Sequence, residues 1–113
     1  MHWKQVCALG IELPDVTEGL WYRMPSLSVR GKSFVGYREE IAAIVLRLEN
    51  VDEQARLTAA NPDVYYVTDH YRASSAVLAR LAALSAPECR LRLERAWRLT
   101  APKSIVKRFD AVQ

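Results

Sequence analysis

The chain has 113 residues and a mass of 12.8 kDa, which is enough to bury one hydrophobic core but not two. Hydrophobic residues make up 50% of the chain and charged residues 26%, a balance that excludes the disordered and collagen-like classes of protein. The net charge is +3, and the basic excess belongs to residues 90–113, which hold seven basic and two acidic side chains.

The N-terminal part of the chain predicts one short helix and then an extended segment. Apolar residues recur at helical spacing over Trp3–Gly10, and Leu13-Pro14 follows as a stop signal because proline disfavours helix in the residue before it. Residues 20–30 are rich in β-formers and are predicted as the first strand. Within this strand Pro25 marks a bend or an edge position, since it cannot donate a hydrogen bond to a neighbouring strand.

A β-hairpin is the clearest local signal in the sequence. Gly31-Lys32 separates two strand-like runs, and glycine at the first central position suits a two-residue type II′ turn. This turn would pair Arg30 with Ser33 and Val29 with Phe34, and would give the sheet one apolar and one polar face.

The middle of the chain predicts a strand, a helix and two more strands. After a turn at residues 38–40, Ile41–Leu48 alternates as a strand, with Arg47 on the face opposite the larger apolar set. Asn50 and Glu53 have capping-box spacing and begin a helix that ends near residue 60. Residues 64–67 and 75–81 are then predicted as strands, joined by a polar loop.

The last predicted helix begins at a capping box over Ser85–Glu88 and ends before Pro102. Trp97 lies on its apolar stripe and is interpreted as a core anchor. The order is therefore α-β(3)-α-β(2)-α, an α+β two-layer α/β sandwich with a mainly antiparallel five-stranded sheet. Residues 1–113 form a single domain in this interpretation, with 103–113 as a C-terminal tail.

Cellular location and redox state are also predicted from composition. Arg, Glu or Lys interrupts every apolar run before it reaches the roughly 20 residues that a membrane span needs. The N-terminal apolar stretch lacks a small-residue cleavage site, so we expect a cytoplasmic protein. Cys7 and Cys89 are far apart and are interpreted as free thiols.

Several segments, in order and over most of the chain, resemble the MmcQ/YjbR family: residues 13–19, 29–34, 61–66, 69–72, 77–81 and 96–103. The resemblance implies a fold similar to the secretion-chaperone-like α-β(3)-α-β(2)-α arrangement. Members of the family are often labelled DNA-binding, so the resemblance implies nucleic acid as a partner. It brings no catalytic motif to carry over.

Strand alternation indicates a first candidate site. Arg30, Arg47 and Arg80 each lie opposite the larger apolar set of their strands, so we expect them to share the open face of the sheet. With Tyr37 and either Tyr65 or Tyr66, this face would combine guanidinium groups with aromatic rings, which suits phosphate contact and base stacking. The default alternative is a solvated face on which arginine stems cover the strands.

The basic C-terminal segment adds Arg98 and Lys103 to the candidate nucleic-acid contacts. The loop Asp69-His70-Tyr71-Arg72 is the second candidate site, because it gathers an acid, an imidazole, a phenol and a guanidinium on one loop. The default for this loop is that Asp69 and His70 satisfy turn backbone.

Enzyme motifs are not recognisable in the sequence. Its four glycines are isolated, and no nucleophile elbow, metal-ligand spacing or phosphate cradle occurs, so we expect no catalytic residues, no cofactor and no metal. The first functional hypothesis is a small non-catalytic binding module with DNA as its partner. The alternatives are a protein-interaction adaptor, and a small-ligand protein or enzyme centred on His70.

Overall fold

The computed structural model describes residues 1–112. Its elements are, in chain order, α1 (Trp3–Gly10), β1 (Val16–Trp21), β2 (Met24–Val29), β3 (Lys32–Arg38), the 3-10 turn η1 (Glu39–Ile41), β4 (Ala43–Arg47), α2 (Val51–Ala60), β5 (Tyr65–Tyr66), β6 (Ala76–Arg80), α3 (Ala86–Thr100) and α4 (Lys103–Ala111). Among residues 1–112, no helix is long and apolar enough to cross a bilayer.

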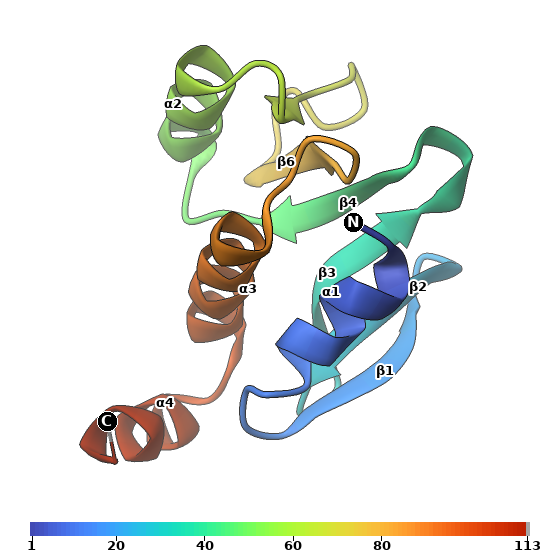
Figure 1. Cartoon of the computed structure of the whole chain (residues 1–113). Helices are drawn as coiled ribbons and strands as arrows, with labels where there is room; N and C mark the ends of the chain where they lie inside the picture. Colours follow the sequence, from blue (N-terminus) through green and yellow to red (C-terminus); the bar gives the residue numbers. More distant parts are fainter. Residues whose placement is uncertain (113) are drawn as a thin grey trace.

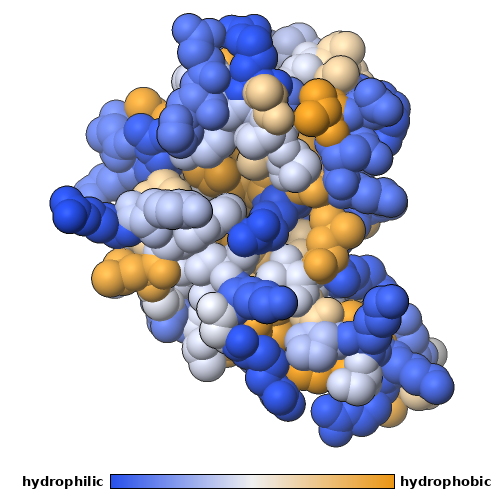
Figure 2. Space-filling model, turned by 180° about the vertical axis from the view of Figure 1, so that it is seen from behind, coloured by the Kyte–Doolittle hydropathy of each residue, from blue (hydrophilic) through white to orange (hydrophobic). Residues whose placement is uncertain are grey.

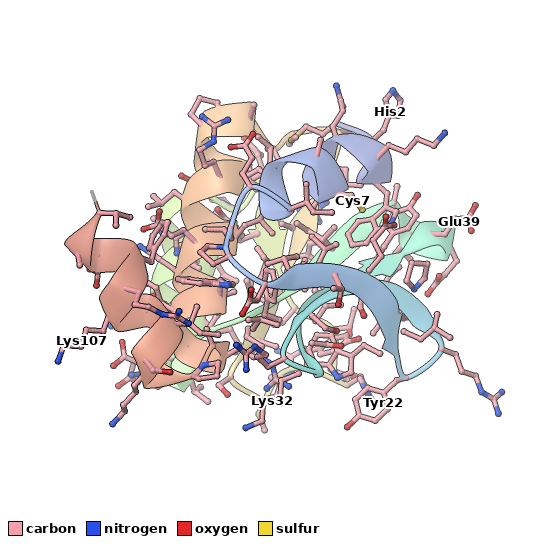
Figure 3. All side chains as sticks on the ribbon, turned by 90° about the horizontal axis from the view of Figure 1, so that it is seen from below. His2, Cys7, Tyr22, Lys32, Glu39 and Lys107 are labelled. Carbon is pink, nitrogen blue, oxygen red and sulfur yellow. The ribbon has the colours of Figure 1, made fainter. Side chains whose placement is uncertain are left out.

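The strands form one antiparallel sheet in the order β1-β2-β3-β4-β6-β5, and α1 and α3 lie against one of its faces (Figure 1). This arrangement confirms the predicted two-layer α+β class. Figure 3 shows the layers from below, with His2, the residue before α1, on one side and Tyr22 and Lys32 projecting from the opposite side. We call the side away from α1 and α3 the open face.

The main core lies between the sheet and these two helices. Trp97 and Leu93 of α3 are fully buried there, together with Ile44 and Leu46 of β4. Because successive side chains of a strand point to opposite faces, Val45 between them lies on the open face. A smaller apolar cluster forms around it from Ala43, Val45, Ala76 and Leu78, against which Trp21, Met24, Tyr66 and Tyr71 pack.

Within residues 1–112 the sheet has six strands rather than the predicted five, because residues 16–29 form two strands instead of one. They are joined by Tyr22 and Arg23, both of which have left-handed backbone, with φ of 50° and 69°. Gly, Asn and Asp are the usual residues in such turns, so the sequence carries no turn signal at this place. Pro25 is tolerated in β2 because its pairing with β3 begins only at Ser26.

The register of the β2–β3 hairpin also differs from the prediction. Arg30 and Gly31 form the turn, both with positive φ, so Val29 pairs with Lys32. A bulge between Leu27 and Ser28 then shifts the register farther along. A bulge inverts the alternation of faces beyond it, which explains why Tyr37, predicted on the open face, stacks on Trp3 of α1 instead.

Most of the predicted C-terminal tail is a helix, α4, while Gln113 lies outside the described residues. Ile105 and Phe109 turn toward the core, and the ring of Phe109 packs edge-on against Trp97 with 5.0 Å between ring centroids. The basic side chains of α4 point elsewhere, and Lys107 projects into solvent (Figure 3). The tail therefore completes the core rather than extending loosely from it.

Candidate functional site

The open face carries a hollow of about 490 Å³ between the β1–β2 hairpin and the loop of residues 68–75. Figure 2 shows this side of the molecule, where a hollowed hydrophobic surface lies between hydrophilic side chains. We call this hollow the open-face pocket. The lining side chains that carry rings or charges are Trp21, Tyr22, Arg38, Glu40, Arg47, His70 and Tyr71.

Arg47 is the cation of the pocket that no acid neutralises. Its Nε donates a 2.6 Å hydrogen bond to the Ser33 carbonyl oxygen, and its guanidinium carbon lies 4.9 Å from the ring centroid of Trp21. No carboxylate of residues 1–112 lies within ion-pair distance of it. The two terminal nitrogens of Arg47 can therefore donate to an anionic ligand.

A second arginine organises the polar side of the pocket. Arg38 Nε donates to Glu40 Oε1 at 2.6 Å, and Arg38 Nη1 donates to the hydroxyl oxygen of Tyr71 at 3.2 Å. The pKa of Glu40 lies below its ordinary value because its own backbone N–H and then Arg38 stabilise the carboxylate. The guanidinium of Arg38 thus holds the Glu40 carboxylate and the Tyr71 hydroxyl close to each other.

Gln54 of α2 holds the loop that brings Tyr71 to the pocket. Its buried side-chain amide lies within hydrogen-bond distance of three carbonyl oxygens, those of Tyr71 at 2.9 Å, Ser74 at 3.0 Å and Ala76 at 2.7 Å. Buried carbonyl groups need a donor. The Tyr71 carbonyl oxygen also accepts from the N–H and the hydroxyl of Ser74, so the Gln54 amide matters most for the carbonyl groups of Ser74 and Ala76. The position of the loop therefore depends on one side chain from another element.

The predicted loop site divides into two halves. His70 and Tyr71 line the pocket, with their rings edge to face and 4.7 Å between centroids. Asp69 and Arg72 are not among the lining residues and pair with each other at 2.8 Å on the exposed side of the loop. Among residues 1–112 no cluster of three metal-ligating side chains occurs.

The three predicted sheet arginines are not brought together. The prediction is wrong for Arg30, which lies in the β2–β3 turn and pairs with Asp15 at 2.9 Å. Arg80 does lie on the open face, where its guanidinium covers the ring of Tyr66 at 4.0 Å. It stands four residues along the strand pair from Arg47, which corresponds to roughly 13 Å.

The C-terminal candidates lie away from the pocket. Arg98 pairs with Asp110 at 2.7 Å and with Glu94 at 3.1 Å, and these hydrogen bonds raise its pKa above the ordinary value. Arg98 thus links α3 to α4, and its guanidinium is already occupied. Lys103 is the first residue of α4 and is exposed.

Trp21, Tyr22, Arg38 and Gln54 belong to the site but are not among the site residues that the sequence predicts. The first two stand at a turn without a turn signal, and the sequence predicts Arg38 in a connecting turn. The one available signal is the apolar and aromatic pair Trp21-Tyr22 beside a basic residue, at the exposed end of a strand. No pattern in the sequence indicates that Gln54 reaches a loop that follows it by some twenty residues.

Comparison with known proteins places the chain in a family. The family model described as YjbR matches residues 11–99, which is most of the chain. The chain belongs to the YjbR family. Its match begins in the turn after α1 and ends in the last turn of α3, so the six strands of the sheet and every residue that lines the pocket lie inside it.

The curated relatives in this comparison are mycobacterial. The chain is 33% identical over 66 residues to the uncharacterized protein Rv2570 of Mycobacterium tuberculosis (strain ATCC 25618 / H37Rv), and equally to the uncharacterized protein Mb2600 of Mycobacterium bovis. The match covers 58% of this chain and 51% of each relative, so the chain spans about half the length of the curated relatives it matches. No solved structure matches the chain.

Proposed function

We propose that this YjbR-family protein is a non-catalytic module that binds single-stranded nucleic acid in the open-face pocket. The observation that supports it best is the unneutralised guanidinium of Arg47 beside the ring of Trp21 in a hollow on an uncovered sheet face. An unpaired nucleotide offers a flat ring and a phosphate together. The pocket offers a ring to stack on and a cation to meet the phosphate.

The shape of the site favours an unpaired strand over a duplex. A duplex hides the faces of its bases by stacking, whereas a single strand can turn a base into a hollow lined by aromatic side chains. Tyr22, 86% exposed at the tip of the β1–β2 hairpin, stands at the edge of this hollow and offers a further ring. Arg80 over Tyr66 repeats the pairing of guanidinium and ring farther along the same face.

The test compares two arginines that differ in their surroundings. Arg47→Met removes the cation of the pocket, while Arg30→Met removes an exposed arginine that is paired with Asp15 in the β2–β3 turn. With a dye-labelled thymidine nonamer, fluorescence anisotropy should show about tenfold weaker binding for Arg47→Met, because a charge-assisted contact is lost. The slope of log affinity against log salt should become shallower by about one.

Arg30→Met should bind within about twofold of the unsubstituted protein. An equal loss in both variants would indicate diffuse attraction to positive charge and would contradict the proposed site. Tighter binding of a duplex than of the nonamer at the same salt concentration would contradict the preference for an unpaired strand.

A second candidate function uses the same pocket for a small anionic ring compound. Its support is the volume of about 490 Å³, which falls in the range of small-ligand sites. Calorimetry with thymidine 5′-monophosphate and with the nonamer separates the two functions. Equal affinity for both would favour the small ligand, whereas a nonamer that binds at least tenfold tighter would favour a nucleic-acid strand.

A further inference from the structure

Glu40 is an anion in a pocket that we propose for an anionic strand. Its place is fixed by the turn η1, which ends at Ala42 in the left-handed conformation, with φ of 50° and its N–H bonded to the Glu39 carbonyl oxygen. Glu40 lines the pocket, while the preceding Glu39 does not and projects outward away from Tyr22 (Figure 3). A carboxylate here repels phosphate, so Glu40 is suited to contact a part of the strand other than its phosphate groups.

The hydrogen-bonding capacity of this side of the pocket is set by Arg38. One oxygen of Glu40 accepts a hydrogen bond from Arg38 Nε. The other oxygen and the remaining lone pairs can accept further hydrogen bonds from a ligand. The hydroxyl oxygen of Tyr71 already accepts from Arg38 Nη1, so its own hydrogen can be donated to a ligand. The pocket thus presents a carboxylate that can accept two hydrogen bonds, that of Glu40, beside a hydroxyl that can donate one, that of Tyr71.

Only one nucleic-acid base has the complementary edge. Guanine presents two adjacent donors, N1–H and the 2-amino group, beside the acceptor O6. Adenine and cytosine place an acceptor nitrogen next to their amino group, and thymine and uracil place their single N–H between two carbonyl oxygens. A carboxylate would meet a lone pair in each of these four bases.

We infer that the open-face pocket selects guanine, with Glu40 accepting from N1–H and the 2-amino group and Tyr71 donating to O6. This inference rests on the proposed binding of single-stranded nucleic acid and names the base that enters the pocket. Stacking on the rings is available to every base, so the carboxylate supplies the discrimination.

The experiment measures anisotropy with labelled thymidine nonamers that carry dG, deoxyinosine, dA, dC or dT at the centre. The unsubstituted protein should bind the dG nonamer roughly tenfold more tightly than the dT nonamer, the size expected for a bidentate base contact. Deoxyinosine lacks the 2-amino group and should fall between them. Glu40→Gln replaces one acceptor by a donor and should remove the advantage of dG over dT, while binding of the dT nonamer should become somewhat tighter because the repulsion between carboxylate and phosphate is lost.

Glu39→Gln is the matched control, because it makes the same chemical change one residue away and outside the pocket, and it should keep the preference for dG. Equal binding of all five nonamers by the unsubstituted protein would overturn the guanine inference and leave the proposed function standing. Retained preference in Glu40→Gln would overturn it as well. Failure of every nonamer to bind would remove both the inference and the proposed function.

Discussion

Arg47 and Arg30 show how the same side chain acquires different roles from its backbone. Arg30 has φ of 50° in a turn, where it reaches the carboxylate of Asp15. Arg47 ends a strand whose alternation directs it onto the open face, and its Nε is held by the Ser33 carbonyl oxygen. Exposed ion pairs such as that of Arg30 contribute little to stability but do reduce the charge available to a ligand.

The two cysteines give a prediction at the scale of single residues. Burial raises the pKa of the Cys89 thiol from 9.0 to about 11, and burial followed by the nearby Glu18 raises that of Cys7 to about 11. A thiol with a raised pKa holds its proton to higher pH, and only the thiolate reacts. At pH 8 the thiolate fraction should therefore be about 100-fold lower in folded than in unfolded protein.

Reaction of the Cys89→Ser variant with Ellman's reagent checks this for Cys7, which is only partly buried and can be reached. Its rate should keep rising tenfold per pH unit up to about pH 10 in the folded protein. In urea the rate should level off near the ordinary thiol pKa of 9.0. A plateau at the same pH in both states would show that the fold does not shift the ionisation of Cys7.

At the scale of elements, the sequence correctly predicts features that depend on contacts between residues close together in the chain. The helix Trp3–Gly10 has the predicted bounds, and Asn50 begins α2 as predicted, with its Oδ1 accepting from the Glu53 N–H at 2.9 Å. The second half of the predicted capping box does not form, because the Glu53 carboxylate accepts from the Glu49 N–H instead. The β1–β2 turn was missed because residues that rarely adopt positive φ occupy it. The sequence does not predict the bulge at Phe34 of β3, because neither strand alone indicates where one residue is left unpaired.

Gln54 provides the prediction at this scale. Gln54→Leu keeps the approximate volume of the side chain and removes the side-chain donor of the Ser74 and Ala76 carbonyl groups, while the Tyr71 carbonyl oxygen keeps the N–H and hydroxyl of Ser74 as donors. We expect the free energy of unfolding to fall by about 1–3 kcal/mol, the usual cost of unsatisfied buried polar groups. Amide hydrogen exchange over residues 68–76 should become faster, and affinity for the nonamer should fall although Gln54 does not line the pocket.

Thr58→Val in the same helix is the control, since the Thr58 hydroxyl donates only to carbonyl oxygens within α2. It should leave the exchange rates of the loop and the affinity for the nonamer unchanged. If Gln54→Leu kept the loop protected from exchange, the loop would owe its position to other contacts and Gln54 would have no positioning role.

At the scale of the whole molecule, the fold redistributes the charge that the sequence places at the C-terminal end. Arg90 pairs with Glu12 at 3.6 Å, Arg92 with Glu88 at 3.5 Å, and Arg98 with Glu94 and Asp110. Three of the seven basic side chains of the last segment are thus engaged in ion pairs within the molecule. The unneutralised cation of the pocket comes instead from β4, which lies outside the basic C-terminal segment.

The candidate site could be predicted only in part, because the fold brings together side chains that are far apart in the sequence. His70, Tyr71 and Arg47 were found because a polar loop and a strand alternation are readable along the chain. Their assembly with Trp21 and Glu40 depends on antiparallel pairing across the sheet and on a loop held from another helix. Such contacts join residues that are far apart in sequence, and a single sequence does not record them.

The tryptophan indoles offer the most direct measurement of where a strand binds. The chain has three tryptophans, of which Trp21 lines the open-face pocket, Trp3 stacks on Tyr37 on the helix side, and Trp97 is buried with its N–H donated to the Pro14 carbonyl oxygen at 3.0 Å. In ¹⁵N-labelled protein titrated with the thymidine nonamer, the indole signal of Trp21 should shift while those of Trp3 and Trp97 stay in place. A shift of the Trp3 signal with Trp21 unmoved would put the strand on the helix side and contradict the open-face pocket as the binding site.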